Sequence, residues 1–183
     1  MRKALYILAD LDEADLAWLA SAGTRRTIEP GATIISRGEP VTDFYIVLDG
    51  TLAVTVEGGK RIATLATGDI VGEMSLIERR PPLASVTALE GARVLSVPQD
   101  AIRERLKEDD AFAARFYRAL AVFLSDRMRS TVAWLGYGAA GENARQTAFE
   151  QEHELDEGLL DTIHVAGDRM RRLLSLLEGQ TAP

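Results

Sequence analysis

The sequence of 183 residues predicts a mainly β fold, a jelly-roll-like β-roll followed by a long helix and a C-terminal helix. Two observations carry this prediction. Short apolar segments separated by turn residues, at about 8–12-residue spacing, fill the first half of the chain and are typical of a sandwich or roll. From Gln99 to Leu135 the apolar residues instead recur with the period of a helix.

The first elements follow in order along the chain. The segment before Asp10 starts with basic residues, but its apolar stretch is short, so we expect a packed N-terminal segment rather than a signal peptide. Asp12–Ala22 is expected to form a short amphipathic helix. Gly58-Gly59-Lys60 lacks the spacer and the following Ser or Thr of a phosphate loop, and is expected to be a hairpin turn. Strands are expected at Arg25–Glu29, Thr33–Ser36, Phe44–Asp49, Thr51–Glu57 and Lys60–Leu65.

The next segment has the pattern of an anion-binding turn. An apolar strand ends at Val71, Gly72 turns the chain, and Glu73–Ile77 is expected to form a short helix. Glycine lets a ligand approach the backbone, and free amides at a helix start favour an anion. The Glu73 carboxylate can accept hydrogen bonds from a sugar diol. After Pro81-Pro82 the chain becomes extended again at Ala84–Ala88.

Three helical segments complete the chain. Asp100–Lys107 is short, whereas Asp110–Trp134 is long and apolar over more than one face, so it must bury two faces. Gly136–Gly141 is expected to be a hinge. In Glu154–Glu178, apolar residues repeat every seven positions, which predicts a short packing seam: Leu159, Ala166 and Leu173, with Ile163, Met170 and Leu177.

Residues 71–86 resemble the phosphate-binding cassette of the cyclic nucleotide-binding domain family, whose pattern is roughly Phe-Gly-Glu-Leu-Ala-Leu, a loop, and Arg-Ala-Ala-Thr-Val. The run Phe44–Gly50 and the turn glycines 31, 50, 68 and 72 also match, so the resemblance covers about residues 10–135. It implies that Glu73 takes the ribose 2′-hydroxyl. The arginine that pairs with the cyclic phosphate in the family is replaced by Pro82.

The resemblance implies cyclic AMP or cyclic GMP as the ligand. The candidate ligand-binding residues are Gly72, Glu73, Met74, Ser75, Arg80 and Ser85. Proline supplies neither charge nor donor, and a lost charge-assisted bond to phosphate would weaken binding roughly tenfold to a hundredfold. Arg79 or Arg80 could reach in from the loop, and the hydroxyls and amides could suffice. Alternatively, the pocket takes another anion or has ceased to bind.

Composition excludes several kinds of site. Without cysteine there is no disulfide and no thiolate metal site, which fits a cytoplasmic protein. His153 and His164 lie in the acidic tail and are expected to be solvated, so we predict no metal. No residue set recommends itself as catalytic, and the protein is expected not to be an enzyme. No apolar run approaches the roughly 18 residues of a membrane span, so no membrane association is expected.

The distribution of charge argues against DNA binding. The net charge is −7, of which residues 137–183 contribute −5, from four basic and nine acidic residues. Such a tail repels phosphates. The 47 residues after Gly136 are also shorter than the roughly 60–70 residues of the winged helix–turn–helix in transcription factors of the same superfamily.

These observations divide the chain into four parts. Residues 1–109 hold the N-terminal helix and the β-roll, 110–135 a dimerisation helix, 136–153 a linker and 154–183 an acidic helical tail. The expected function is that of a cyclic-nucleotide-sensing regulatory homodimer, which transmits its ligand state through the C-terminal helices to a partner. The first alternative is a ligand-free scaffold that binds a protein through residues 154–178. The second and less favoured one is a transcription factor.

Overall fold

The computed structural model describes residues 5–136 and 157–179, and it has two antiparallel four-stranded sheets. The strand order is β1-β8-β3-β6 in one sheet and β2-β7-β4-β5 in the other. The strands are β1 Thr24–Ile28, β2 Thr33–Ile35, β3 Asp43–Asp49, β4 Leu52–Thr55, β5 Arg61–Leu65, β6 Ile70–Val71, β7 Ser85–Ala88 and β8 Ala92–Pro98. The predicted β-roll with flanking helices is therefore confirmed.

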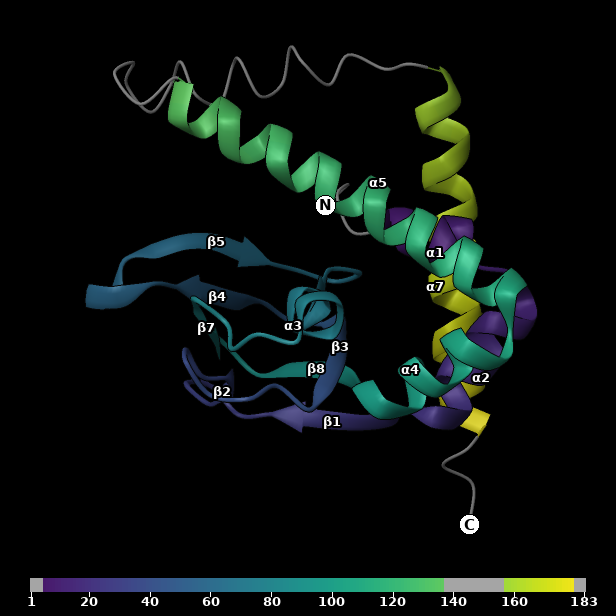
Figure 1. Cartoon of the computed structure of the whole chain (residues 1–183), viewed down its shortest axis with the longest axis horizontal. Helices are drawn as coiled ribbons and strands as arrows, with labels where there is room; N and C mark the ends of the chain where they lie inside the picture. Colours follow the sequence, from purple (N-terminus) through teal and green to yellow (C-terminus); the bar gives the residue numbers. More distant parts are fainter. Residues whose placement is uncertain (1–4, 137–156, 180–183) are drawn as a thin grey trace.

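The helical elements are α1 Leu5–Asp10, α2 Glu13–Ala22, the 3-10 turn η1 Glu57–Gly59, α3 Glu73–Glu78, α4 Gln99–Glu108, α5 Asp110–Gly136 and α7 Glu157–Gly179. Helices α1, α2, α4 and α7 gather at one end of the roll, α5 runs from that end across the roll, and α3 lies among the strands (Figure 1). The turn η1 joins the antiparallel pair β4 and β5, so Gly58-Gly59 lies in a hairpin connection as predicted. Among residues 5–136 and 157–179, no helix is both long and apolar enough to cross a bilayer.

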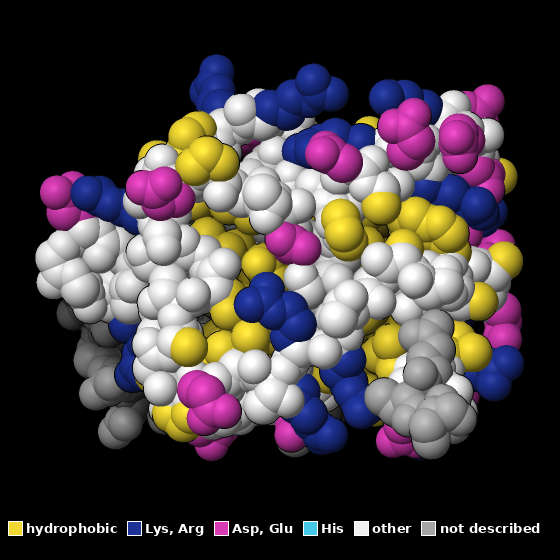
Figure 2. Space-filling view, turned by 90° about the horizontal axis from the view of Figure 1, so that it is seen from below, with side chains coloured by type: hydrophobic (Ala, Val, Ile, Leu, Met, Phe, Trp, Pro, Cys, Tyr) yellow, Lys and Arg dark blue, Asp and Glu magenta, His cyan; other side chains and the backbone are white. Residues whose placement is uncertain are grey.

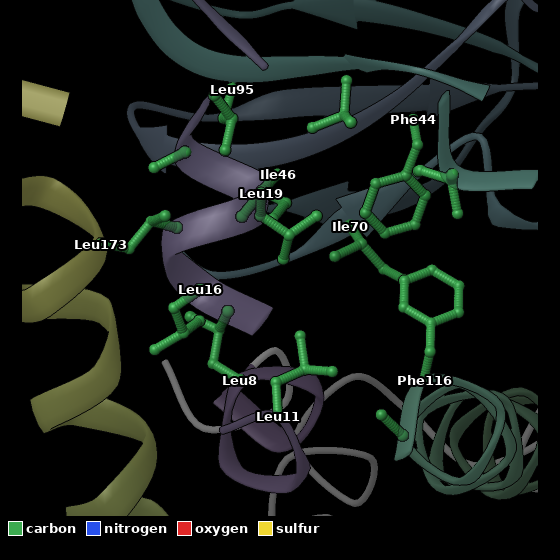
Figure 3. Packing of buried hydrophobic residues seen from close by; sticks show 14 of the residues in the cluster. Leu8, Leu11, Leu16, Leu19, Phe44, Ile46, Ile70, Leu95, Phe116 and Leu173 are labelled. Carbon is green, nitrogen blue, oxygen red and sulfur yellow. The ribbon is translucent and has the colours of Figure 1, made fainter. Parts of the chain in front are cut away.

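The apolar side chains form two separate clusters. One lies within the roll and contains Val47, Leu52 and Val94. The other joins the roll to the helices, where the Phe44 ring from β3 lies 5.9 Å from the Phe116 ring of α5. Figure 3 shows Phe116 directed from its helix toward Phe44 and Ile70. One face of α5 thus covers the roll, as its apolar pattern predicts.

Two elements were not predicted from the sequence. No strand is expected at residues 92–98, yet β8 pairs with both β1 and β3 and lies inside its sheet. The N-terminal segment, expected only to pack, forms α1 and buries Leu8. The predicted hinge lies outside the described residues apart from Gly136, and Gly136 itself belongs to α5.

The tail helix α7 packs on its own chain. Its main contacts are with α1 and α2, and Figure 3 shows Leu173 facing Leu16 and the other apolar residues of the N-terminal helices. Four of the six residues of the predicted seam are buried: Ala166, Met170, Leu173 and Leu177. The side chains of Leu159 and Ile163 and all of His153 lie outside the described part, and His164 is exposed as expected.

Candidate functional site

The candidate site begins at Gly72, between β6 and α3. Gly72 has φ 93°, in the left-handed region. A Cβ built on it would lie 2.6 Å from the backbone oxygen of Asp43, well inside van der Waals contact. Both facts strongly disfavour any residue with a Cβ at this position. The glycine therefore serves the close approach of two backbone segments as well as the turn toward α3.

The Glu73 carboxylate is buried and paired. The residue is 2% exposed, and Arg127 Nη1 of α5 donates to Glu73 Oε1 at 2.9 Å. Burial raises the pKa of Glu73 above its ordinary 4.5, although Arg127 and the backbone N–H groups of Glu73 and Met74 lower it. The carboxylate predicted to meet a ribose thus forms an ion pair with the long helix.

A second connection from the same place leads to α4. The buried side chain of Gln99 donates from Nε2 to the Gly72 oxygen at 3.0 Å, and it also approaches the Asp43 oxygen at 3.4 Å. Gln99 Oε1 in turn accepts from Arg103 Nη2 at 2.6 Å. Two adjacent cassette residues, Gly72 and Glu73, are therefore bonded to both helices that follow the roll.

The other predicted ligand-binding residues have different surroundings. Met74 is 52% exposed. Ser75 is buried, and its hydroxyl donates to the Arg80 oxygen at 3.0 Å, which holds the loop after α3. Ser85 Oγ accepts from the Arg37 N–H at 3.0 Å. Both hydroxyls thus already bond to the protein backbone.

Arg79 and Arg80 share a pocket with α4. Both line a pocket of about 670 Å³ together with residues of α4 and of the β2–β3 loop, Pro40 and Val41. Ser75 also lines this pocket, whereas Glu73 and Ser85 do not. The pocket thus brings Arg80 together with Ser75, another predicted ligand-binding residue, but not with Glu73.

Sequence reasoning missed Arg127 and Gln99. Arg127 lies 54 residues from Glu73, and Gln99 lies 27 residues from Gly72. No local pattern marks either residue, because the contact depends on how α4 and α5 return to the roll. Within the described part of the chain, no cluster of three or more His, Asp or Glu side chains could hold a metal ion.

Comparisons with known proteins identify a family for the part of the chain that contains the cassette. The family model of the cyclic nucleotide-binding domain matches residues 25–109. The cAMP-dependent protein kinase regulatory subunit of Yarrowia lipolytica is 35% identical over 116 residues, which are 59% of this chain and 31% of that protein. Glutaminase 1 of Bradyrhizobium diazoefficiens is 35% identical over 123 residues, 67% of this chain and 20% of the enzyme.

Solved structures show the same fold. A cyclic nucleotide-binding domain from Methylobacillus flagellatus superposes with a TM-score of 0.68 at 21% identity, covering 76% of this chain and 84% of that one. The N-terminal domain of a transcriptional regulator from Streptomyces coelicolor gives 0.57 at 25% identity, covering 69% and 91%. The chain spans less than a third of the curated relatives named above, and these relatives differ in activity.

Proposed function

From the premise that residues 25–109 belong to the cyclic nucleotide-binding domain family, we propose that this protein is a non-enzymatic sensor of a cyclic nucleotide, cyclic AMP or cyclic GMP. The observation that carries the proposal is the buried Glu73, to which the family resemblance assigns the ribose hydroxyl and which is the partner of Arg127 on α5. A cytoplasmic location follows from this role and agrees with a sequence that lacks cysteine.

The ion pair supplies a route from ligand to helix. A ribose hydroxyl that donates to Glu73 competes with Arg127 for the carboxylate oxygens or adds to their bonds. Either outcome changes the free energy of the α5 position relative to the cassette. The Gln99 bond to Gly72 couples α4 to the same two residues. A ligand that binds one arrangement of these helices better than another shifts the population toward it.

The signal then passes to a second copy of the chain through α5. Tyr117 and Met128 lie on one stripe of this helix and are 52% and 64% exposed. Among the described residues, the face opposite the roll is therefore apolar and uncovered. We place the homodimer interface there. The seam of the tail is buried in cis, so a protein partner of the tail would meet its outer face instead.

Calorimetry with cyclic AMP and cyclic GMP tests the sensor. We expect saturable binding by the wild type and a loss of about tenfold to a hundredfold in Glu73→Gln, which removes a charged acceptor from a buried site. Glu78→Gln is the matched control, because Glu78 is an exposed carboxylate at the other end of α3. Equal affinity in Glu73→Gln and Glu78→Gln would contradict the role of Glu73.

The alternative is a ligand-free scaffold, and Pro82 favours it. Pro82→Arg separates the two functions, because it restores the cation at the family's position. The Pro82 oxygen that accepts from the Gly38 N–H at 2.9 Å belongs to the backbone and is retained. If the rest of the cassette can still bind a cyclic nucleotide, this variant binds the nucleotide about tenfold or more tightly than the wild type does. Absence of heat with either nucleotide in both proteins would remove the sensor and leave the scaffold.

The transcription-factor alternative has little support on the visible surface. Figure 2 shows the face seen from below Figure 1, where Lys and Arg side chains lie among Asp, Glu and hydrophobic ones. DNA binding uses a continuous basic surface, which this face does not present. A gel shift with random duplex DNA checks this, and tight binding would overturn the charge argument.

A further inference from the structure

The pocket between the loop after α3 and helix α4 has a charge opposite to that of the chain. Four cations line it, Arg79, Arg80, Arg103 and Lys107, against two carboxylates, Asp100 and Glu104. Its lining side chains therefore sum to +2 in a chain of net charge −7. A local reversal of sign at a concave surface concentrates anions there.

The two carboxylates are already occupied. Asp100 accepts from Arg103 at 2.8 Å, and Glu104 lies 3.6 Å from Lys107. Arg79 and Arg80 form no ion pair within residues 5–136 and 157–179. The surplus charge of the pocket thus resides on two adjacent arginines that are open to an external anion.

The backbone at Arg79 is unusual for its residue type. Arg79 ends α3 with φ 55°, and within the described chain no other residue besides glycine has a positive φ. Glycine is the common choice at such a helix end, because a side chain there costs conformational energy. Arginine at this position places a charge beside the pocket, although its backbone conformation is less favourable than that of glycine.

The opposite wall is held in place and connected to the cassette. Arg103 is fixed by Asp100 and by Gln99, at 2.8 and 2.6 Å. Gln99 donates to the Gly72 oxygen at 3.0 Å. An anion that binds Arg103 therefore competes with Gln99 for this guanidinium and so affects the hydrogen bond from Gln99 to Gly72.

We propose that this pocket is a second anion site, which does not include Glu73, that binds a phosphate monoester and is coupled to the cassette through Arg103 and Gln99. The net charge of +2 matches the dianion of a monoester, whereas a cyclic phosphodiester carries a single negative charge. Through the Gln99 bond, the occupant of this pocket adjusts the cassette that the proposed cyclic nucleotide occupies.

Phenyl phosphate and phenyl sulfate test the charge requirement. The two have nearly the same shape, but at about pH 7.5 the phosphate is largely a dianion and the sulfate a monoanion. Titration by calorimetry at constant ionic strength should show saturable binding of phenyl phosphate and at least about tenfold weaker binding of phenyl sulfate. No saturable binding of phenyl phosphate, or equal binding of both, would overturn the proposal.

Three variants localise the binding. Arg79→Gly suits the left-handed backbone, so it removes the charge without threatening the fold, and Arg80→Ser removes the neighbour. Each should weaken phenyl phosphate binding by about tenfold. Arg61→Ser, at an exposed arginine of β5 outside the pocket, is the control and should bind like the wild type. A loss as large in Arg61→Ser would show only non-specific charge attraction.

Two further measurements distinguish this pocket from the proposed cyclic nucleotide site at Glu73. Glu73→Gln should bind phenyl phosphate like the wild type, because the probe has no ribose and Glu73 does not line the pocket. In amide NMR spectra, phenyl phosphate should shift the Gly72 resonance in the wild type but not in Arg80→Ser at the same concentration. Abolished binding in Glu73→Gln, or an unmoved Gly72 signal at saturation, would refute a coupled site that does not include Glu73.

Discussion

At the scale of single residues, the cassette is determined by a glycine whose replacement would strain the backbone and by a carboxylate that is already paired. The spacing of Gly72 and Glu73 after an apolar strand could be read directly from the sequence, because turn and strand signals are local. The pairing of Glu73 with Arg127 could not, since it depends on the rotation of α5 about its axis at a distance of 54 residues. The sequence thus predicts where the site lies but not its electrostatic state.

Gly72→Ala is expected to destabilise the protein more than a positive φ alone requires. Gly72 and Gly58 both have positive φ, 93° and 78°, but only the Cβ at Gly72 meets backbone, whereas nothing lies within 4 Å of a Cβ at Gly58. We expect about 1 kcal/mol for Gly58→Ala and about 3 kcal/mol for Gly72→Ala. Urea unfolding measures both. Equal losses would mean that the clash with Asp43 is relieved without cost.

The lowered pKa of Asp15 leads to a prediction of how the stability of the protein depends on pH. Burial raises its pKa, but the hydrogen bonds from Arg115, at 2.6 and 2.8 Å, and from the backbone of Asp12 outweigh this and lower it below 3.8. The stability from Asp15 is therefore present above the unfolded value near 3.8 and is lost as pH falls through the lower folded pKa. Unfolding at several pH values measures this loss.

The variant Asp15→Asn should lack that part of the acid dependence and be less stable near neutral pH by about 3 kcal/mol, because Arg115 loses a buried partner. Glu39→Gln, at an exposed carboxylate of the β2–β3 loop, is the control and should retain the acid dependence of the wild type. If the stability of Asp15→Asn fell with decreasing pH as steeply as that of the wild type, the pH dependence would have to come from other groups.

At the scale of elements, turn glycines and apolar alternation predict most strands to within two residues, because each such signal is local. Strand β8 was missed because buried residues run consecutively from Val94 to Val97, without the alternation that marks a strand. The seam of α7 was predicted from its heptad pattern, but its partner was not. A heptad pattern predicts that one face of a helix is buried but does not identify the element that covers it. In the structure, α1 and α2 cover this face.

Met170→Asp is expected to release α7 while leaving the roll folded. Met170 is 6% exposed and belongs to the cluster between the roll and the helices, whereas the cluster inside the roll contains no residue of α7. A buried charge at this position disfavours packing by several kcal/mol. Hydrogen exchange should show loss of protection in α7 and α1 with strands β3 and β8 unaffected. Val165→Asp, at a 42% exposed position of the same helix, should leave α7 protected.

At the scale of the whole molecule, helix α5 has two apolar faces, and the described chain covers only one of them. Phe112, Phe116 and Phe123 of α5 are buried against the roll and the N-terminal helices. On the other side, Tyr117, Met128 and Val132 fall within about a quarter turn of one another and are 52%, 64% and 62% exposed. A stripe of this kind is typical of a helix that meets its own copy across a two-fold axis.

Met128→Asp should therefore convert a dimer into a monomer. The substitution places two like charges close together across a two-fold interface, while in the monomer it lies at an exposed position and costs little. Light scattering after gel filtration should give twice the chain mass for the wild type and the chain mass for the variant. Ile62→Asp, at a 48% exposed apolar residue of β5, is the control and should remain dimeric. A monomeric wild type, or a dimer that survives Met128→Asp, would show that α5 does not form the interface. The proposed ligand signal would then have to leave the molecule through α4 or the outer face of α7.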